Sequence, residues 1–418
     1  MSAIKTYALK VRRFSRAARL LLLASILFSL GWAISAVLFP LYLIALGNRE
    51  DFIGSMSSVA GIACGLAAIP AGVLLDRTSR KLTMIWASVA SGVFALAQIA
   101  FPSRAVLLGA NAITGGLGAV FLVVQSPFFM DNSTPDERSY LFGLSSASMT
   151  VTSILGSMLA GRLPGLAAFA LGLGAESVLA FKYALLAGLM FQGLGMVPVL
   201  FIHEARDRAR GSADANSSQG PALSWSVLPS RRTIEKICLV NMLIGFGTGL
   251  GLPFVNVLFK LRLGLSTETI GVLTAVQNAA ITLSILSYPF VERKLGRRVF
   301  ISAAQVISSV FMLVMGLPVP VPVVVVAFFI RGSLANMAHP ARQKFSMETV
   351  TQAERARTSS FEQFFWQILF GAGASLGGYL IRYHGYTPAF SLAAVFFALA
   401  GLVYGFGFKE EERRLKEA

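Results

Sequence analysis

Charged side chains are scarce in this sequence. Asp, Glu, Lys and Arg make up 13% of its 418 residues, about half of the roughly 25% typical of soluble domains. Hydrophobic residues make up 55%. This composition excludes a disordered chain and argues against an ordinary cytosolic enzyme, so lipid is the expected solvent. The apolar runs lack the alternation of barrel strands, which favours transmembrane helices over a membrane barrel.

Cysteine and histidine are also rare. Cys64 and Cys238 both lie in apolar segments, which excludes a disulfide framework and a cysteine-based zinc site. The three histidines, His203, His339 and His384, are scattered along the chain. The sequence contains no H-E-x-x-H and no phosphate-binding glycine loop. We therefore expect no enzyme activity, no catalytic residues, no metal and no cofactor.

Twelve apolar runs are long enough to cross a bilayer, since about 20 helical residues span roughly 30 Å of hydrocarbon. They lie near residues 20–46, 52–75, 82–101, 106–130, 141–159, 178–202, 237–259, 270–291, 299–317, 322–339, 360–381 and 387–408.

The basic residues predict the orientation of these spans. If the N-terminus is cytoplasmic, 28 of the 36 Lys and Arg fall in cytoplasmic segments and 6 in the opposite loops. This asymmetry places both termini in the cytoplasm by the positive-inside rule. Because the basic residues sit in short clusters between apolar runs, the net charge of +16 indicates contact with anionic lipids and no nucleic-acid binding.

The chain contains an internal repeat. Shifted by 217 residues, Gly54 aligns with Gly271. In the same register, Gly156, Gly161 and Glu137-Arg138 align with Gly373, Gly378 and Glu354-Arg355. We expect six-helix bundles over 1–202 and 237–418, joined by a polar cytoplasmic linker over 203–236. Parallel repeats of this kind place a transport pathway at their interface, near the membrane midplane.

The loop after the second span carries a charged motif. It runs from Gly72 through Asp76-Arg77 to Arg80-Lys81, and it resembles the signature G-x-L-x-D-R-x-G-R-K of the major facilitator superfamily, with Ser79 replacing the second glycine. The resemblance implies an all-α membrane fold of twelve helices in two pseudo-symmetric six-helix bundles. It also implies a charge cluster that closes the cytoplasmic side.

The second copy of this motif is altered, because Arg293 stands where Asp76 stands in the first and the nearest acid, Glu292, comes one residue early. The expected gating residues are Gly72, Asp76, Arg77, Arg80, Lys81, Asp131, Arg297 and Glu348.

Polar residues within the spans are candidates for function, because a charge at the bilayer centre costs about 2.5–3.5 kcal/mol on insertion scales. Arg331 lies in mid-span, where we expect it to bind substrate, to contact backbone carbonyls at a kink or to reach Glu362. Glu362 is the best candidate for proton coupling. The resemblance assigns the first, fourth, seventh and tenth spans to the cavity. Further candidate substrate residues on these spans and their neighbours are Trp32, Asn111, Gln125, Asn256, Gln277, Asn278 and Asn336.

Together these features predict a secondary active transporter that moves a small molecule by alternating access. Few intramembrane charges favour export of amphipathic compounds. Uptake or facilitated diffusion of a small organic anion or sugar is the alternative, which Arg331 supports. A more distant alternative is a non-transporting sensor with the same fold. Protons or another ion are the expected coupling partner, and we expect a monomer in a prokaryotic plasma membrane.

Overall fold

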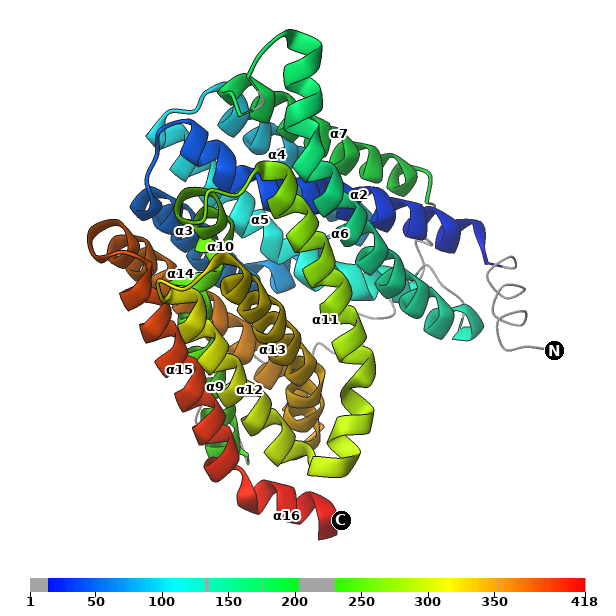
Figure 1. The fold of residues 1–418 in the computed structure, drawn as a ribbon. Helices are drawn as coiled ribbons and strands as arrows, with labels where there is room; N and C mark the ends of the chain where they lie inside the picture. The colour runs from blue at the N-terminus through cyan, green and yellow to red at the C-terminus, as the bar shows by residue number, and fades with distance from the viewer. Residues whose placement is uncertain (1–13, 132–134, 175, 203–229, 353, 418) are drawn as a thin grey trace, which may run out of the picture. The chain divides into compact units, whose positions relative to one another are not determined.

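The structure is a computed structural model that describes residues 14–131, 135–174, 176–202, 230–352 and 354–417. Side chains at 69, 72–77, 125–127, 130–131, 135–140, 356 and 414–417 lie outside this description. Every regular element in the described ranges is helical (Figure 1). Twelve of the described helical segments are long and apolar enough to cross a membrane, so the predicted all-α membrane fold is confirmed.

The first half of the chain contains six long helices: α2 (Arg16–Ala45), α3 (Glu50–Arg77), α4 (Arg80–Ala100), α5 (Arg104–Asp131), α6 (Pro135–Leu171) and α7 (Val178–Leu200). The second half contains α9 (Arg231–Gly251), η2 (Leu252–Phe254), α10 (Val255–Val257), η3 (Leu258–Arg262), α11 (Thr267–Leu295), α12 (Arg297–Gly316), α13 (Val321–Thr349), α14 (Arg355–His384), α15 (Tyr386–Gly407) and α16 (Lys409–Glu417). The predicted linker lies outside the described residues over 203–229.

Several helices extend past the ends that hydropathy predicts. Helix α13 ends at Thr349 rather than near His339, and α14 begins at Arg355 rather than near residue 360. Hydropathy marks the part of a helix inside the hydrocarbon, whereas backbone hydrogen bonding continues until a cap or a break ends it. The extension places Arg342 and Ser346, which the predicted spans leave in a loop, inside α13.

Pro40 and Pro253 occupy comparable places in the first and seventh spans, where proline can kink a helix, but the two behave differently. Helix α2 remains α-helical through Pro40. At Pro253, α9 instead gives way to a 3-10 turn, followed by one turn of α-helix and a π-helical turn over Leu258–Arg262. Proline removes one backbone hydrogen-bond donor and clashes with the preceding turn. Packing against neighbouring helices then determines whether the helix continues through the proline or breaks.

The chain divides into two compact units. One comprises Met1–Leu46, Leu66–Gly220 and Thr267–Ala275, and the other comprises Gly47–Gly65, Pro221–Ser266 and Val276–Ala418. We call them unit 1 and unit 2. Each unit therefore consists mainly of one half of the chain plus the first part of one helix, α3 or α11, from the other half.

The exchanged segments make equivalent glycine contacts in the two units. In unit 2, a Cβ atom on Gly54 of α3 would lie 3.0 Å from Cα of Gly378 of α14. In unit 1, a Cβ atom on Gly271 of α11 would lie 2.7 Å from Cα of Gly161 of α6. Gly54 and Gly271 are equivalent in the sequence repeat, as are Gly161 and Gly378, so the repeat appears in the structure as one helix contact made twice.

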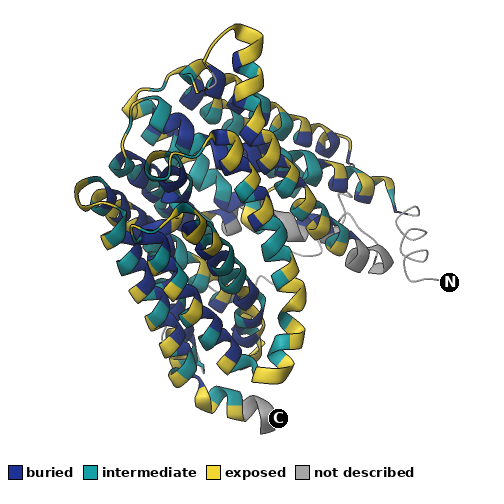
Figure 2. Cartoon of the chain, in the orientation of Figure 1, coloured by how far each residue is buried: buried dark blue, intermediate teal, exposed yellow. Residues whose placement is uncertain are grey.

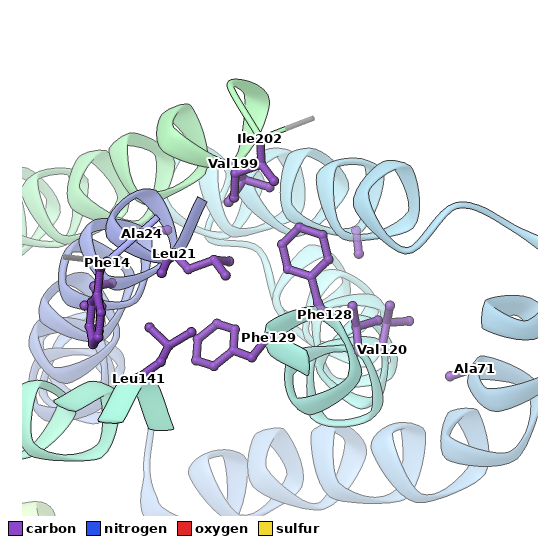
Figure 3. Close-up of a cluster of buried hydrophobic side chains, with 14 residues drawn as sticks. Phe14, Leu21, Ala24, Ala71, Val120, Phe128, Phe129, Leu141, Val199 and Ile202 are labelled. Atoms are coloured by element: carbon purple, nitrogen blue, oxygen red, sulfur yellow. The ribbon is translucent and has the colours of Figure 1, made fainter. Parts of the chain in front are cut away.

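Apolar side chains form the core of each unit, and many large apolar side chains are exposed. Figure 2 shows that buried and exposed positions alternate along the helices. In unit 1, α2, α5, α6 and α7 meet around a buried cluster that includes Leu21, Phe128, Phe129, Leu141 and Val199 (Figure 3). Large apolar side chains such as Phe169, Phe290 and Phe406 are exposed. Exposed apolar surface of this kind is expected of helices whose outer faces contact lipid.

Candidate functional site

The first charged motif lies at the end of α3 and the start of α4. The side chains of Gly72, Asp76 and Arg77, and those of Gln125 and Asp131 on α5, lie outside the described residues. Arg80 is the first residue of α4, and the Ser79 hydroxyl caps this helix by accepting from the Leu82 amide at 3.2 Å. Ser79 therefore caps the start of α4 at the position where the family signature has glycine.

Lys81 contacts the end of a different helix. Its Nζ donates to the backbone oxygens of Leu200 at 2.7 Å and Ile202 at 2.6 Å. These carbonyls lie at the C-terminal end of α7, where helix carbonyls lack helical partners and the helix dipole favours a cation. Lys81 therefore fixes the start of α4 against the end of α7 within unit 1.

The second copy of the motif forms an ion-pair network in unit 2. Arg297 at the start of α12 pairs with Glu292 of α11, Nε to Oε1 at 2.6 Å, and also with Glu348 of α13. Glu292, although it comes one residue early in the motif, reaches Arg297 because the chain turns sharply at Gly296, whose φ is +79°. The structure thus brings Arg297 and Glu348 together and adds Glu292, which the motif comparison left unpaired.

A second charged network, which the sequence reasoning missed, holds α16. Glu411 pairs with Lys236 of α9 at 2.9 Å, and Glu412 pairs with Arg298 of α12 at 2.8 Å. Both cations also donate to backbone oxygens near the end of α15, Lys236 to Gly407 and Arg298 to Gly405. The run of three glutamates after the last apolar segment could have indicated this network.

Arg331 is enclosed within unit 2. Its side chain is 5% exposed, and its guanidinium carbon lies 4.9 Å from the centre of the Phe397 ring on α15. The Ser308 hydroxyl of α12 donates to its backbone oxygen at 3.3 Å. Among the described residues, Arg331 Nε has no hydrogen-bond partner and no ion pair joins Arg331 to Glu362.

Gln277 lies beside the same turn of α13. It is 5% exposed, and a Cβ atom on Gly332 would lie 2.8 Å from its Cδ. Within the part of the chain that the structure describes, neither amide atom of Gln277 has a hydrogen-bond partner. Asn336, one turn later, donates from Nδ2 to the Gly332 oxygen at 2.8 Å.

The remaining candidate substrate residues are distributed over both units. Trp32 on α2 is 63% exposed, and Asn111 on α5 is half-buried. Asn256 in α10 and Asn278 on α11 are half-buried in unit 2. The role of these residues in substrate binding stays a prediction.

Glu362 on α14 lies in a polar cluster inside unit 2. The Ser346 hydroxyl of α13 donates to its carboxylate oxygen Oε1. Arg342 lies one turn before Ser346 on α13. The sequence did not predict roles for Arg342 and Ser346, because the predicted span ended at His339. Their i, i+4 spacing, which places both on one face of a helix, could have indicated them.

Glu354 connects the starts of two helices. Its carboxylate accepts from the Ser230 amide, just before α9, at 3.0 Å, and from the amide and hydroxyl of Thr351 at 3.2 and 2.6 Å. Burial acts to raise the pKa of this carboxyl, but the hydrogen bonds from Thr351 and Ser230 outweigh burial and lower its pKa. The ionised form of Glu354 is therefore the form that holds the start of α9 in place.

Twelve membrane-length helices, a two-fold sequence repeat and charged networks at helix ends are features typical of membrane transporters. The sequence matches the family model of the Major Facilitator Superfamily over residues 21–276 and 237–418. The chain belongs to this superfamily. A search among curated protein sequences gave no match.

Solved transporter structures share the fold. The nucleoside transporter NupG is 16% identical with a TM-score of 0.74, over 95% of this chain and 99% of that one. A bacterial homolog of the human lysosomal transporter Spinster is 14% identical with a TM-score of 0.74, over 96% and 98%. A D-xylose-proton symporter is 15% identical with a TM-score of 0.69, over 93% and 96%. At these identities the likeness extends to the fold alone.

Proposed function

We propose that this protein is a secondary active transporter that moves a small molecule by alternating access and is driven by protons through Glu362. The observation that carries the proposal is the half-buried position of Glu362 on one membrane-length helix, hydrogen-bonded to Ser346 on another. A carboxyl that is partly removed from water can hold and release a proton near neutral pH. The structural likeness to a D-xylose-proton symporter is consistent with proton coupling.

We favour export of amphipathic compounds as the direction of transport. The membrane-length helices contain few charges, and their surfaces and cores are rich in apolar side chains, which suits an amphipathic substrate. Uptake of a small organic anion is the alternative, and Arg331 supports it because a buried guanidinium can bind a carboxylate through two parallel hydrogen bonds. We further propose a monomer in a prokaryotic plasma membrane with both termini cytoplasmic.

Transport in liposomes tests the proposal once a compound that raises the unfolding temperature has been found in a panel of metabolites and drugs. With an acidic lumen, an exporter that exchanges protons accumulates the compound inside, whereas a symporter does not. We expect Glu362→Gln to lose pH-driven accumulation and to retain exchange of labelled for unlabelled compound. The control is Glu410→Gln, which alters an exposed carboxylate of α16. Normal pH-driven accumulation by Glu362→Gln would remove the coupling role.

A further inference from the structure

A polar cluster lies in the interior of unit 2, where α12 packs against both α13 and α15 (Figure 1). Helix α13 contributes Arg331, whose guanidinium carbon lies 4.9 Å from the centre of the Phe397 ring on α15. Helix α12 contributes Ser308, whose hydroxyl donates to the Arg331 backbone oxygen at 3.3 Å. Gln305, one turn before Ser308, is 2% exposed. The cluster therefore combines one cation with two neutral polar side chains inside a bundle of membrane-length helices.

The packing of α15 places Gln305 beside the ring that contacts Arg331. A Cβ atom on Gly401, one turn after Phe397, would lie 3.2 Å from Cβ of Gln305 and 3.0 Å from the Ser302 backbone oxygen. The absence of a side chain at Gly401 thus lets α15 approach α12 closely. Arg331 and Gln305 therefore border the same turn of α15 from two neighbouring helices.

The two long polar side chains of this cluster lack protein partners. Among the described residues, Arg331 forms no ion pair and its Nε has no hydrogen-bond partner. Neither amide atom of Gln305 has a partner in the same part of the chain. The Phe397 ring attracts the guanidinium but does not neutralise it. Because an unpaired charge is very costly in a low-dielectric interior, this arrangement suits a ligand with a negative charge.

The first half of the chain indicates that the fold does not require a cation here. Helices α4 and α5 begin 217 residues before α12 and α13, so the sequence repeat stays in register over both pairs. In this register, Thr114 aligns with Arg331 and Ser88 aligns with Gln305. The Thr114 hydroxyl donates to the Asn111 backbone oxygen of its own helix at 3.2 Å. Short hydroxyl side chains therefore fit between these helices in unit 1, and the cation is particular to unit 2.

We propose that Arg331 and Gln305 bind one small monovalent anion, of the size of chloride, in the interior of unit 2. The Nε–H of Arg331 and the amide N–H of Gln305 donate to the anion, and the guanidinium supplies the opposite charge. Water can accept the same hydrogen bonds but cannot neutralise the charge. Arg331, Gln305 and Ser308 are all buried, which favours a single-atom anion over an organic carboxylate. The site gives Arg331 a ligand other than a transported anion and does not depend on Glu362.

Thermal unfolding of the purified full chain in detergent tests the site without a substrate. Sodium gluconate is exchanged for sodium chloride at constant ionic strength, which holds general screening fixed, and gluconate is too large for an enclosed site. We expect the unfolding temperature to rise with chloride and then to level off. At ten times the dissociation constant, chloride should lower the unfolding equilibrium constant about elevenfold. Equal unfolding temperatures in chloride and gluconate overturn the proposal.

Substitutions locate the effect. Arg331→Gln should remove the dependence on chloride, and Gln305→Met, which keeps the size of the side chain, should raise the dissociation constant about tenfold. One control is Arg262→Gln, at a half-buried arginine whose Nη1 donates to the Gly316 oxygen at 2.8 Å. The other is Gln98→Met, at a buried glutamine of unit 1. Both controls should keep the wild-type dependence on chloride. A chloride effect that survives Arg331→Gln overturns the assignment.

Equilibrium dialysis with radioactive chloride counts the bound ions directly. We expect one ion per wild-type chain and none for Arg331→Gln. If Arg331→Gln does not fold, Gln305→Met decides, since an unchanged chloride affinity in that variant overturns the site. Stabilisation by organic carboxylates but not by chloride also overturns it and supports a substrate role for Arg331. Neither measurement involves pH-driven flux, so the result is independent of whether Glu362 couples transport to protons.

Discussion

At the residue scale, several charged side chains are held by helix ends rather than by other charges. Lys81 binds carbonyls at the end of α7, and the Glu354 carboxylate binds the amide before α9. Such contacts stabilise because the last carbonyls and first amides of a helix have no partners within it. The motif comparison identified Lys81 as notable, but its contact depends on where α7 ends in space, which the loop sequence does not encode.

Glu354→Gln should make stability less dependent on pH. The carboxyl has a lowered pKa in the folded protein, so its stabilising effect is complete above the unfolded pKa of about 4.3 and is lost as pH falls through the folded pKa. We expect the variant to lose about 1–2 kcal/mol at pH 7, since a charge-assisted hydrogen bond becomes a neutral one. Thermal unfolding at pH 7 and pH 4 measures this. Equal pH slopes in the variant, wild type and Glu410→Gln would contradict it.

Arg331→Lys separates substrate binding from a structural role. If Arg331 binds an anionic substrate, we expect the variant to unfold at the wild-type temperature and to lose about tenfold in affinity, because an ammonium keeps the charge but not the bidentate geometry. Arg262→Lys, at an arginine 5.8 Å from the Tyr386 ring, is the control for loss of an arginine beside an aromatic ring. Lower stability with unchanged affinity would show that the contact with Phe397 is structural.

At the element scale, the helices themselves were predicted well and their ends were not. All twelve spans are present, because an unbroken apolar run in lipid must satisfy its backbone hydrogen bonds internally. The extension of α13 to Thr349 and the break at Pro253 were not predictable in detail. Both features depend on which neighbouring residues cap the helix end and which side chains pack against it.

Gly271→Ala should disrupt the contact between α11 and α6. Its Cβ would lie 2.6 Å from the Ser157 oxygen and 2.7 Å from Gly161 Cα, and these backbone atoms can yield only if the helices separate. We expect a loss of about 1–3 kcal/mol, as for other overpacked sites. The control Gly92→Ala in α4 meets nothing within 4 Å and should be neutral or slightly stabilising. Thermal unfolding of both variants in detergent decides, and equal stabilities would contradict the close contact.

At the scale of the whole molecule, the distribution of basic residues predicts the orientation in the membrane. The networks around Arg297 and around α16 lie in segments assigned to the cytoplasmic side. Asp51 and Arg382, which pair within unit 2, lie in segments assigned to the opposite side. These charged residues form contacts between helix ends, and their distribution along the chain predicts the orientation.

Cysteine labelling tests this orientation. Arg49→Cys places an exposed thiol before α3, and Lys409→Cys places one at the start of α16. The native Cys64 and Cys238 are buried, so they should contribute little background. In intact cells, a membrane-impermeant maleimide should label Arg49→Cys and should label Lys409→Cys only after the membrane is opened. The reverse pattern would invert the topology.

The membrane environment, the number of spans and the two-fold repeat follow from the residues alone, because hydropathy, charge placement and internal similarity depend on residue type and order. Which polar side chains meet depends on how the helices pack. Asp51 and Arg382 are 331 residues apart in the chain, and they form an ion pair because the start of α3 packs against the end of α14. Arg331 likewise lies against Phe397 because packing turns it toward α15. Such contacts depend on the rotation and depth of each helix, which side-chain packing between neighbours fixes.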